Sequence, residues 1–504
     1  MAEPTLHKDG FVLIKISRRA VRLSGLHIAI AVLLLMLLAY LWIGVIPYND
    51  GAGWDGDVYV AYVKSLAAGI PISGDPYRSI RLSGFLQLVP FAWGGSSKAT
   101  LVLIQMLFNT GLMAIGTGCL FSCLRTLGVE SRKAIFSVAL MTISWAGMVM
   151  PIFYPVLSDN LAIPICCIAL WCWANNRNVP LYIMCGWFVW LFPGLFLVPL
   201  GLITFPFKRE ENLETIQFPH TVKKSLFALF FITGLVIYYF LMKNITTTNI
   251  AAHMANGGST AVPSLIPISI LIQCMTIAIL AWIGARILCL SQIYQSIRLS
   301  GLLLGIFIVS ASYLVMSLTI NFSTGFQGPP LLDNLMMQGA AAPLKTWVAH
   351  FLYFGFFVPL VAAHCIQWSL RGQPGIPLGL LIVFIAFFPF MSFGSESRQW
   401  VGIIPVAIAI YALVKNTRKQ QIFMIVISMI SLFTLHGLRS NTEVAVERGL
   451  AIQSYEWQYY FGRQGPWMSV DVYELSLMAL IAVAALYLWL GAIENRPLAA
   501  PTPH

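Results

Sequence analysis

Residues 27–46 read HIAIAVLLLMLLAYLWIGVI, a stretch that contains no Asp, Glu, Lys or Arg. An apolar run of about 20 residues is long enough to cross the hydrocarbon core of a bilayer as a helix. Similar runs recur along the whole chain, which is 58% hydrophobic and only 10% charged, whereas a soluble domain has about 25% charged residues. The sequence therefore predicts an all-α integral membrane protein and excludes an ordinary soluble enzyme.

The apolar runs predict about thirteen to fourteen transmembrane helices. Twelve runs are expected to cross the membrane singly: 27–46, 99–120, 134–152, 160–174, 225–243, 266–289, 300–320, 347–366, 377–392, 401–415, 421–435 and 475–492. The stretch 180–206 contains Pro193, Gly194 and Pro199 and begins and ends on the same side, so we expect a broken hairpin of two short helices there.

These spans divide the chain into four parts. A basic cytoplasmic tail, 1–26, precedes a first transmembrane module, 27–206, whose long outer loop is 48–98. A second module, 207–492, has outer loops 244–265, 321–347 and 437–474, and a cytoplasmic tail, 493–504, follows it.

The net charge of +11 fits a membrane better than a nucleic acid. Lys and Arg lie in the N-terminal tail and in short loops near residues 125–133, 208–224 and 415–419, not on one continuous surface. Because loops rich in Lys and Arg stay in the cytoplasm, this distribution predicts that both termini are cytoplasmic and that the acidic first loop lies outside. We expect membrane lipids, and no nucleic acid, as partners.

The first outer loop carries the clearest chemical signal. It reads Tyr48-Asn-Asp-Gly-Ala-Gly-Trp-Asp-Gly-Asp57, so Asp50, Asp55 and Asp57 lie close together with no basic residue between them. Such carboxylates are often solvated turn residues, but a carboxylate here can also act as a general base. Residues 58–68 then predict an amphipathic helix at the membrane interface, with Asp57 and Lys64 on one face.

A second segment of the same loop, Asp75-Pro-Tyr-Arg-Ser-Ile-Arg81, predicts the start of a helix. Asp75 suits the N-cap position and Pro76 the first helical position. Arg78 and Arg81 are three residues apart, so both would project near the positive end of that helix, an arrangement suited to binding phosphate.

Later outer turns add further candidates. Ser395-Glu-Ser-Arg398 places an acid beside a base at the entrance of a helix, either as a local ion pair or as a functional pair. Asp159 is either a helix cap or a functional acid. The loop 437–474 is rich in aromatic residues that could stack on sugars, although an aromatic belt at the headgroup level is the favoured interpretation.

In these motifs the sequence resembles the GT-C class of membrane glycosyltransferases. The resemblance rests on Trp54-Asp-Gly-Asp-Val-Tyr59, on the segment 75–81, on Ser158-Asp-Asn160 and on Glu396-Ser-Arg398. It implies that the first module is catalytic and that the sugar donor is carried on a polyprenyl phosphate or diphosphate. The resemblance also leaves open whether a divalent metal takes part.

The resemblance assigns roles to particular residues. Asp55 corresponds best to the catalytic acid, with Asp50 and Asp57 as rivals, and the carrier phosphate is expected at Arg78, Arg81 and Arg398. Supporting roles fall to Lys64, Asp159 and Glu396. The bacterial members that it most resembles imply a bacterial inner membrane with a periplasmic site.

Three functions follow as hypotheses. The first is an inverting glycosyltransferase that moves a sugar from a polyprenyl-phosphate donor to a glycan or lipid acceptor at the outer face. The second is an O-antigen polymerase or ligase that acts on polyprenyl-diphosphate-linked oligosaccharides. The third is a lipid or solute transporter, which the scarcity of ionisable residues inside the apolar runs disfavours.

Overall fold

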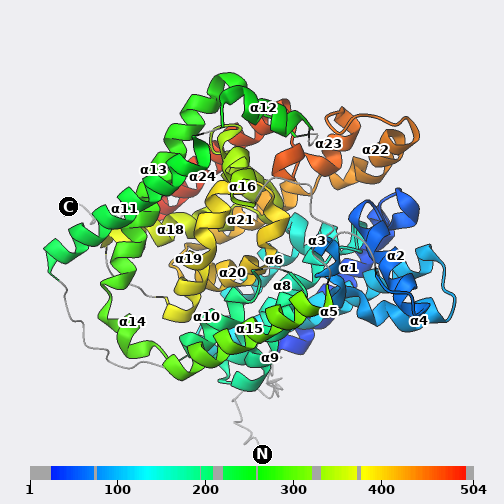
Figure 1. Ribbon diagram of the computed structural model, residues 1–504, viewed down its shortest axis with the longest axis horizontal. Helices are drawn as coiled ribbons and strands as arrows, with labels where there is room; N and C mark the ends of the chain where they lie inside the picture. The colour runs from blue at the N-terminus through cyan, green and yellow to red at the C-terminus, as the bar shows by residue number, and fades with distance from the viewer. Residues whose placement is uncertain are drawn as a thin grey trace, which may run out of the picture.

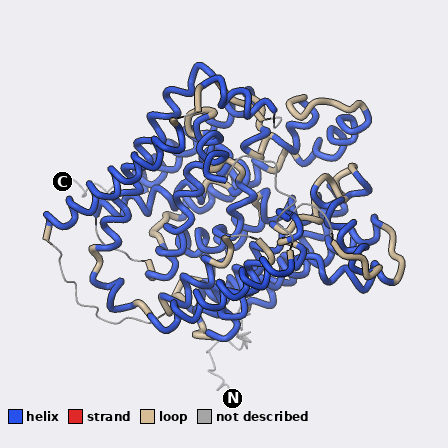
Figure 2. Tube along the Cα trace, viewed as in Figure 1, coloured by secondary structure: helices blue, strands red, loops and turns tan. Residues whose placement is uncertain are grey.

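The computed structural model describes residues 24–72, 76–192, 194–207, 219–243, 245–256, 259–320, 331–371 and 376–494. Over these residues the chain is helical, with no strand (Figures 1 and 2). Nearly all of the two predicted tails, 1–26 and 493–504, lies outside the described residues, as do loop residues 321–330 and Asp75, the predicted N-cap.

Seven helical segments of the described chain are long and apolar enough to cross a membrane. They are α1 (Gly25–Ile43), α5 (Lys98–Thr126), α11 (His220–Met242), α13 (Ile266–Leu288), α15 (Leu299–Thr319), α24 (Val470–Glu494), and α21 (Arg418–Ser431) continued by α22 (Leu435–Glu447). An eighth is possible where α6 (Ser131–Thr142) meets the π-helical turn η3 (Trp145–Val149) and α7 (Met150–Phe153) at a bend of 71°. The chain is thus an all-α protein with the architecture of a multi-pass membrane protein.

The number of full-length spans is smaller than the thirteen to fourteen crossings expected from the sequence, because the other apolar runs form shorter helices. These are α8 (Asp159–Ala174), α9 (Asn178–Val189), α10 (Leu197–Thr204), α17 (Lys345–Phe354), α18 (Phe357–Arg371), α19 (Leu378–Phe393) and α20 (Ile404–Leu413). The predicted division of 180–206 into two short helices is confirmed by α9 and α10.

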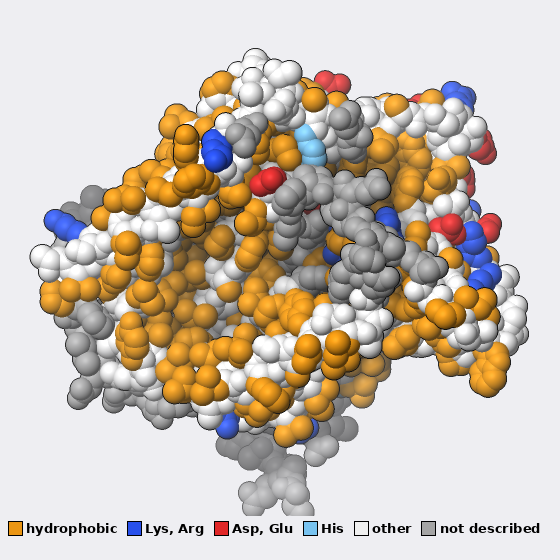
Figure 3. Space-filling model, in the orientation of Figure 1, with side chains coloured by type: hydrophobic (Ala, Val, Ile, Leu, Met, Phe, Trp, Pro, Cys, Tyr) orange, Lys and Arg blue, Asp and Glu red, His pale blue; other side chains and the backbone are white. Residues whose placement is uncertain are grey.

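The short helices form the interior, and several of the long ones form the periphery. Every residue of α20 up to Ala412 is buried, as is nearly all of α8. By contrast, α11, α15 and α24 expose many large apolar side chains, and orange hydrophobic side chains cover much of the face shown in Figure 3. This is the distribution expected when lipid tails, rather than water, surround the outer helices.

Close helix packing at the centre depends on glycine. A Cβ on Gly118 of α5 would lie 2.6 Å from the carbonyl oxygen of Gly25 in α1. A Cβ on Gly116 would lie 2.6 Å from the Cα of Pro164 in α8. Small residues therefore let α1, α5 and α8 approach one another closely, as in many membrane helix pairs.

The predicted outer loops are themselves largely helical. The first contains η1 (Asn49–Gly51), α2 (Asp55–Ala67), α3 (Pro76–Ser79), η2 (Leu82–Leu88) and α4 (Val89–Trp93). The later ones contain α12 (Thr247–Asn256), η4 (Pro263–Leu265), α16 (Leu331–Ala340), α23 (Tyr455–Phe461) and η6 (Gly465–Trp467). Two further elements are α14 (Ser291–Ser296), in a predicted cytoplasmic loop, and η5 (Ser397–Ile403), which leads into α20.

Helix α2 is amphipathic as predicted, but its apolar face meets protein. Tyr59, Val60 and Val63 pack in one core cluster with Phe85 of η2 and Leu101 of α5. The first outer loop is therefore a small packed layer attached to α5, and the apolar face expected at the membrane interface is covered by η2, α4 and α5. This layer fixes the position of the first turn of α2.

Candidate active site

Asp55, in the first turn of α2, lies between two guanidinium groups. Its Oδ1 is 2.7 Å from Nη2 of Arg78, and its Oδ2 is 3.1 Å from Nη1 of Arg398. Arg78 belongs to α3 and Arg398 to η5, so the structure brings together residues from two distant loops. Bonds between ionised groups in a partly buried site are stronger than bonds between neutral groups.

The second guanidinium is held in place by its own turn. Oε1 of the buried Glu396 accepts a hydrogen bond of 2.5 Å from Nε of Arg398, and its Oε2 accepts one of 2.5 Å from Gln399. The side-chain oxygen of Gln338 in α16 accepts bonds from the backbone N–H groups of Ser395 and Glu396 at 3.0 and 3.2 Å. Arg398 is therefore fixed on one side by Glu396 and presents its other side to Asp55.

The glycines on either side of Asp55 are required because the backbone there lies close to neighbouring residues. The hydroxyl oxygen of Tyr154 accepts hydrogen bonds from the backbone N–H groups of Asp55 at 2.8 Å and Gly56 at 3.4 Å. Gly53 has φ +69°, and a Cβ there would lie 2.4 Å from the Tyr154 ring; a Cβ on Gly56 would lie 2.8 Å from the carbonyl oxygen of Val156. The first turn of α2 can pack against Tyr154 and Val156 only because these two positions lack a side chain.

We expect Gly53→Ala to lower the free energy of unfolding by about 3 kcal/mol, through strain at positive φ plus overpacking against Tyr154. The matched control is Gly95→Ala, which also has a positive φ, +78°, but has nothing within 4 Å of its Cβ. The control should lose only about 1–2 kcal/mol. Equilibrium unfolding of both variants, followed by tryptophan fluorescence, measures the difference; equal losses would contradict the close contact with Tyr154.

Two further charged residues border the Asp55 cluster. Arg81 is 8% exposed, and its guanidinium carbon lies 3.9 Å from the ring centroid of Tyr77 and 4.4 Å from that of Phe192. Its Nε has no hydrogen-bond partner among the described residues. Asp159 begins α8, with Ser158 rather than Asp159 at the cap position; it is buried and experiences the charges of Arg398 and Arg81.

We define the charged cluster as Asp55, Asp159, Glu396, Arg78, Arg81 and Arg398. Its three carboxylates balance its three guanidinium groups. Asp55 and Glu396 form ion pairs with Arg78 and Arg398, which offset part of the cost of burying these charges.

The other predicted residues lie outside this cluster. Asp57 is half-buried and its Oδ1 is 2.6 Å from Nζ of Lys98, so it pairs with α5 and not with Lys64. Lys64 is exposed in the last turn of α2, and Asp50 is exposed in η1. The structure therefore separates Asp55 from its two rivals and gives Lys64 no contact with the cluster.

The charged cluster does not fit a metal ion. Within the described residues, no three His, Cys, Asp or Glu side chains lie together in an arrangement that could hold one. The oxygens of Asp55 and Glu396 are already bonded to Arg and Gln donors, and the nearby guanidinium groups would repel a cation.

Burial and the neighbouring positive charges shift the pKa of Asp55 in opposite directions. Burial would raise the pKa of its carboxyl group, but the charge of Arg398, together with the hydrogen bond and charge of Arg78, holds the pKa below its ordinary value of 3.8. Asp55 is therefore a carboxylate at neutral pH.

Sequence reasoning missed how the last outer loop supports this cluster. Trp54 packs against Trp457, Tyr460 and Phe461 of α23, with ring centroids 5.3, 6.2 and 5.2 Å away. These three aromatic residues are buried, so they do not form the expected belt at the headgroup level. The glycine pairs and the aromatic count could have suggested tight packing, but no sequence signal identifies Tyr154 or Gln338 as partners.

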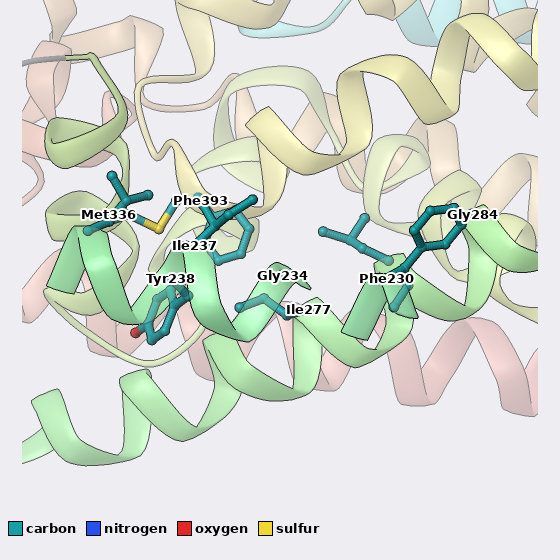
Figure 4. A pocket seen from close by; sticks show the side chains of 11 residues that line it. Phe230, Gly234, Ile237, Tyr238, Ile277, Gly284, Met336 and Phe393 are labelled. Carbon is teal, nitrogen blue, oxygen red and sulfur yellow. The ribbon is translucent and has the colours of Figure 1, made fainter. Parts of the chain in front are cut away.

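An apolar cavity of about 400 Å³ lies between α11 and α13 (Figure 4). Phe230 and Ile237 line it from α11 and Ile277 from α13, and it ends at Met336 of α16 and Phe393 of α19. These last two residues are two positions from Gln338 and Ser395, so α16 and α19 connect the cavity to the turn that holds Arg398.

Comparison with known protein families, with curated protein sequences and with solved structures finds no match to this chain. The fold and the site therefore define the protein: an all-α protein with the architecture of a multi-pass membrane protein and a partly buried carboxylate–guanidinium cluster between its predicted outer loops and its interior helices.

Proposed function

We propose that this protein is a membrane glycosyltransferase that moves a sugar from a polyprenyl-phosphate carrier to a hydroxyl group of a glycan or lipid acceptor. The observation that carries this proposal is the Asp55 carboxylate held between Arg78 and Arg398, with Arg81 beside it. A carboxylate can accept a proton from a hydroxyl group, and guanidinium groups are well suited to a phosphate.

The proposed reaction is a single displacement. The acceptor oxygen forms a bond to the anomeric carbon while its proton passes to Asp55. The bond between that carbon and the phosphate oxygen breaks, and its electron pair stays on the phosphate, where Arg78 and Arg398 stabilise the charge. Attack from the face opposite the leaving group inverts the anomeric configuration.

The salt bridges of Asp55 also suggest how donor binding prepares the base. Phosphate oxygens compete with Asp55 for the guanidinium donors of Arg78 and Arg398. Loss of these bonds would make the Asp55 carboxylate more basic, and general bases work best when their pKa is closer to the working pH. In this scheme the base is strengthened when the phosphate is bound.

The apolar cavity supports a lipid-linked donor. Its walls are formed mainly by helices α11 and α13, both long enough to span a membrane, and its apolar lining suits a hydrocarbon chain. We place the polyprenyl chain there and its phosphate at Arg398, because Phe393 and Ser395 join the two sites through one short segment.

A transfer assay tests the proposal. The purified protein in lipid nanodiscs receives decaprenyl-phosphate-linked hexoses carrying tritium in the sugar, together with a membrane glycolipid extract. Label should move to a product that is not the carrier, with one decaprenyl phosphate released per sugar. If label instead moves only from decaprenyl-diphosphate-linked oligosaccharides, the polymerase or ligase alternative replaces this proposal; transport of the carrier without a new glycoside would point to a transporter.

The pH dependence of transfer tests the role of Arg78. Because Arg78 lowers the pKa of Asp55 while burial raises it, Arg78→Gln should raise that pKa and move the acid limb of kcat/KM to higher pH. The wild-type carboxylate, by contrast, should stay ionised down to below its ordinary pKa of 3.8. Rates measured from below pH 3.8 up to pH 8 cover both limbs and reveal the shift.

The control for this measurement is Lys98→Gln, which removes the cation from Asp57 instead of Asp55. It should leave the acid limb where it is in the wild type. An acid limb that does not move in Arg78→Gln would contradict Asp55 as the titrating base.

A further inference from the structure

A polar pocket of about 510 Å³ lies between α22 and α23, apart from the charged cluster. Thr434, His436, Ser440, Asn441 and Tyr459 line it, and none of its lining residues is Asp, Glu, Lys or Arg. Its volume is within the range of small-molecule sites, about 300–1,000 Å³. Hydroxyl, amide and imidazole groups beside an aromatic ring are suited to a neutral, hydroxyl-rich ligand.

Two polar groups of this pocket, on His436 and Asn441, retain hydrogen-bonding capacity. Nδ2 of Asn441 donates to the carbonyl oxygen of Gly437 at 2.8 Å, which leaves its Oδ1 as an acceptor. The exposed imidazole of His436 has no hydrogen-bond partner among the described residues. The pocket can therefore exchange hydrogen bonds with a ligand without disrupting its own walls.

An apolar groove of about 380 Å³ adjoins this pocket. Leu38 and Trp42 line the groove from α1, and Met429 of α21 and Leu432, the residue after the end of that helix, line it from the other side. Both helices belong to segments long enough to cross a membrane. Phe433, which is 74% exposed, lines the groove and the polar pocket alike, so the two spaces meet at the turn between α21 and α22.

We propose that the groove and the pocket form one binding site for a sugar-bearing lipid. The hydrocarbon chain lies between α1 and α21, and the uncharged sugar lies between α22 and α23. A lipid with a phosphate headgroup is disfavoured because recognition of phosphate uses Arg or Lys, and neither lines the pocket. The apolar groove in turn disfavours a free, water-soluble sugar.

This site is distinct from the charged cluster but adjacent to it through α23. Tyr459 faces α22, whereas Trp457, Tyr460 and Phe461 face Trp54, the residue before Asp55. The inference that this site binds a sugar-bearing lipid does not depend on the proposed glycosyltransferase function. The further step, that this lipid is the acceptor that receives the sugar, rests on the proposed function.

The binding can be measured with tritiated dodecyl maltoside on the full chain in phosphatidylcholine nanodiscs, purified without glycoside detergents. We expect saturable binding below the micelle concentration. Dodecylphosphocholine, with the same chain and a phosphate headgroup, should compete at least 10-fold more weakly, and maltose, which has no chain, should compete as weakly. Equal competition by dodecylphosphocholine, or equal competition by maltose, would overturn the proposal.

Two substitutions locate the site. Asn441→Ala should weaken binding of dodecyl maltoside at least 10-fold. Its matched control is Asn175→Ala, which removes the same kind of bond, Nδ2 to the carbonyl oxygen four residues earlier at 2.8 Å, from a helix end outside the pocket. Wild-type affinity in Asn441→Ala, or an equal loss in Asn175→Ala, would place the ligand elsewhere.

A third substitution separates this inference from the proposed function. Asp55→Asn should bind dodecyl maltoside like the wild type, because the charged cluster does not line the site. Binding of dodecyl maltoside by the wild type, together with no sugar transfer by the wild type, would defeat the glycosyltransferase proposal alone. Loss of binding in Asp55→Asn would defeat the claim that the two sites are distinct.

Discussion

Asp55→Asn should reduce sugar transfer by about 10³-fold or more, because the amide cannot accept the proton of the acceptor hydroxyl group. The amide has nearly the same shape as the carboxylate, and the backbone bond from Asp55 to Tyr154 is unchanged by it. The variant should therefore remain folded. The loss should appear in kcat, measured with tritiated donor in nanodiscs, since the substitution affects the chemical step.

Asp55→Asn should lower kcat without weakening the binding of the carrier. Asp55 competes with phosphate for Arg78 and Arg398, so its neutral replacement should bind decaprenyl phosphate as tightly as the wild type or more tightly. A loss of kcat with preserved or improved carrier affinity is a pattern that general unfolding cannot produce.

The matched control is Asp57→Asn, two residues along the same helix. Asp57 forms a partly exposed pair with Lys98 outside the charged cluster, and such pairs contribute about 0–1 kcal/mol. Transfer should stay within about 2-fold of the wild type, since no group of the cluster changes. Inactivity of Asp57→Asn together with full activity of Asp55→Asn would reverse the assignment.

Much of the fold could be predicted from hydrophobic runs and helix-breaking residues. The expected start of the run at residue 266 matches α13 (Ile266–Leu288), and the prolines and glycine in 180–206 signalled its division into α9 and α10. The number of full crossings could not be predicted, because an apolar run of 10–17 residues has the same composition whether its helix is surrounded by lipid or by protein. Burial of α8 and α20 is a property of their neighbours, not of their own residues.

The residues of the candidate site could be predicted from the sequence only in part. The family resemblance pointed to Asp55, Arg78, Arg81 and Arg398, and in the structure the guanidinium groups of Arg78 and Arg398 lie 2.7 and 3.1 Å from the Asp55 carboxylate. Spacing alone could not separate Asp55 from Asp57. Their difference depends on Lys98, 41 residues further along, and on Tyr154, which fixes the direction of the first helical turn.

Helical periodicity also does not identify the partner of Asp57. Residues seven apart share a helix face, as Asp57 and Lys64 do. The cation that pairs with Asp57 is nevertheless Lys98, at the start of α5. Sequence spacing predicts which residues are neighbours within one helix. Which cation pairs with a given carboxylate depends on how the helices pack against one another.

Arg398→Gln should have the second large effect, on stability and on transfer together. Arg398 bonds to both Glu396 and Asp55, so its removal leaves the buried Glu396 carboxylate without its cation. Breaking a buried pair from one side costs about 3–5 kcal/mol. Transfer should fall by about 10²–10³-fold, because the departing phosphate loses a guanidinium donor.

The double variant Glu396→Gln/Arg398→Gln separates these two effects. Removing both partners eliminates the orphaned carboxylate, so most of the lost stability should return, while the phosphate still lacks Arg398 and transfer should remain low. Unfolding curves and transfer rates of both variants, measured in the same nanodiscs, provide the comparison. If transfer recovers in step with stability, then Arg398 only holds Glu396 in place, and the donor phosphate is bound by other residues.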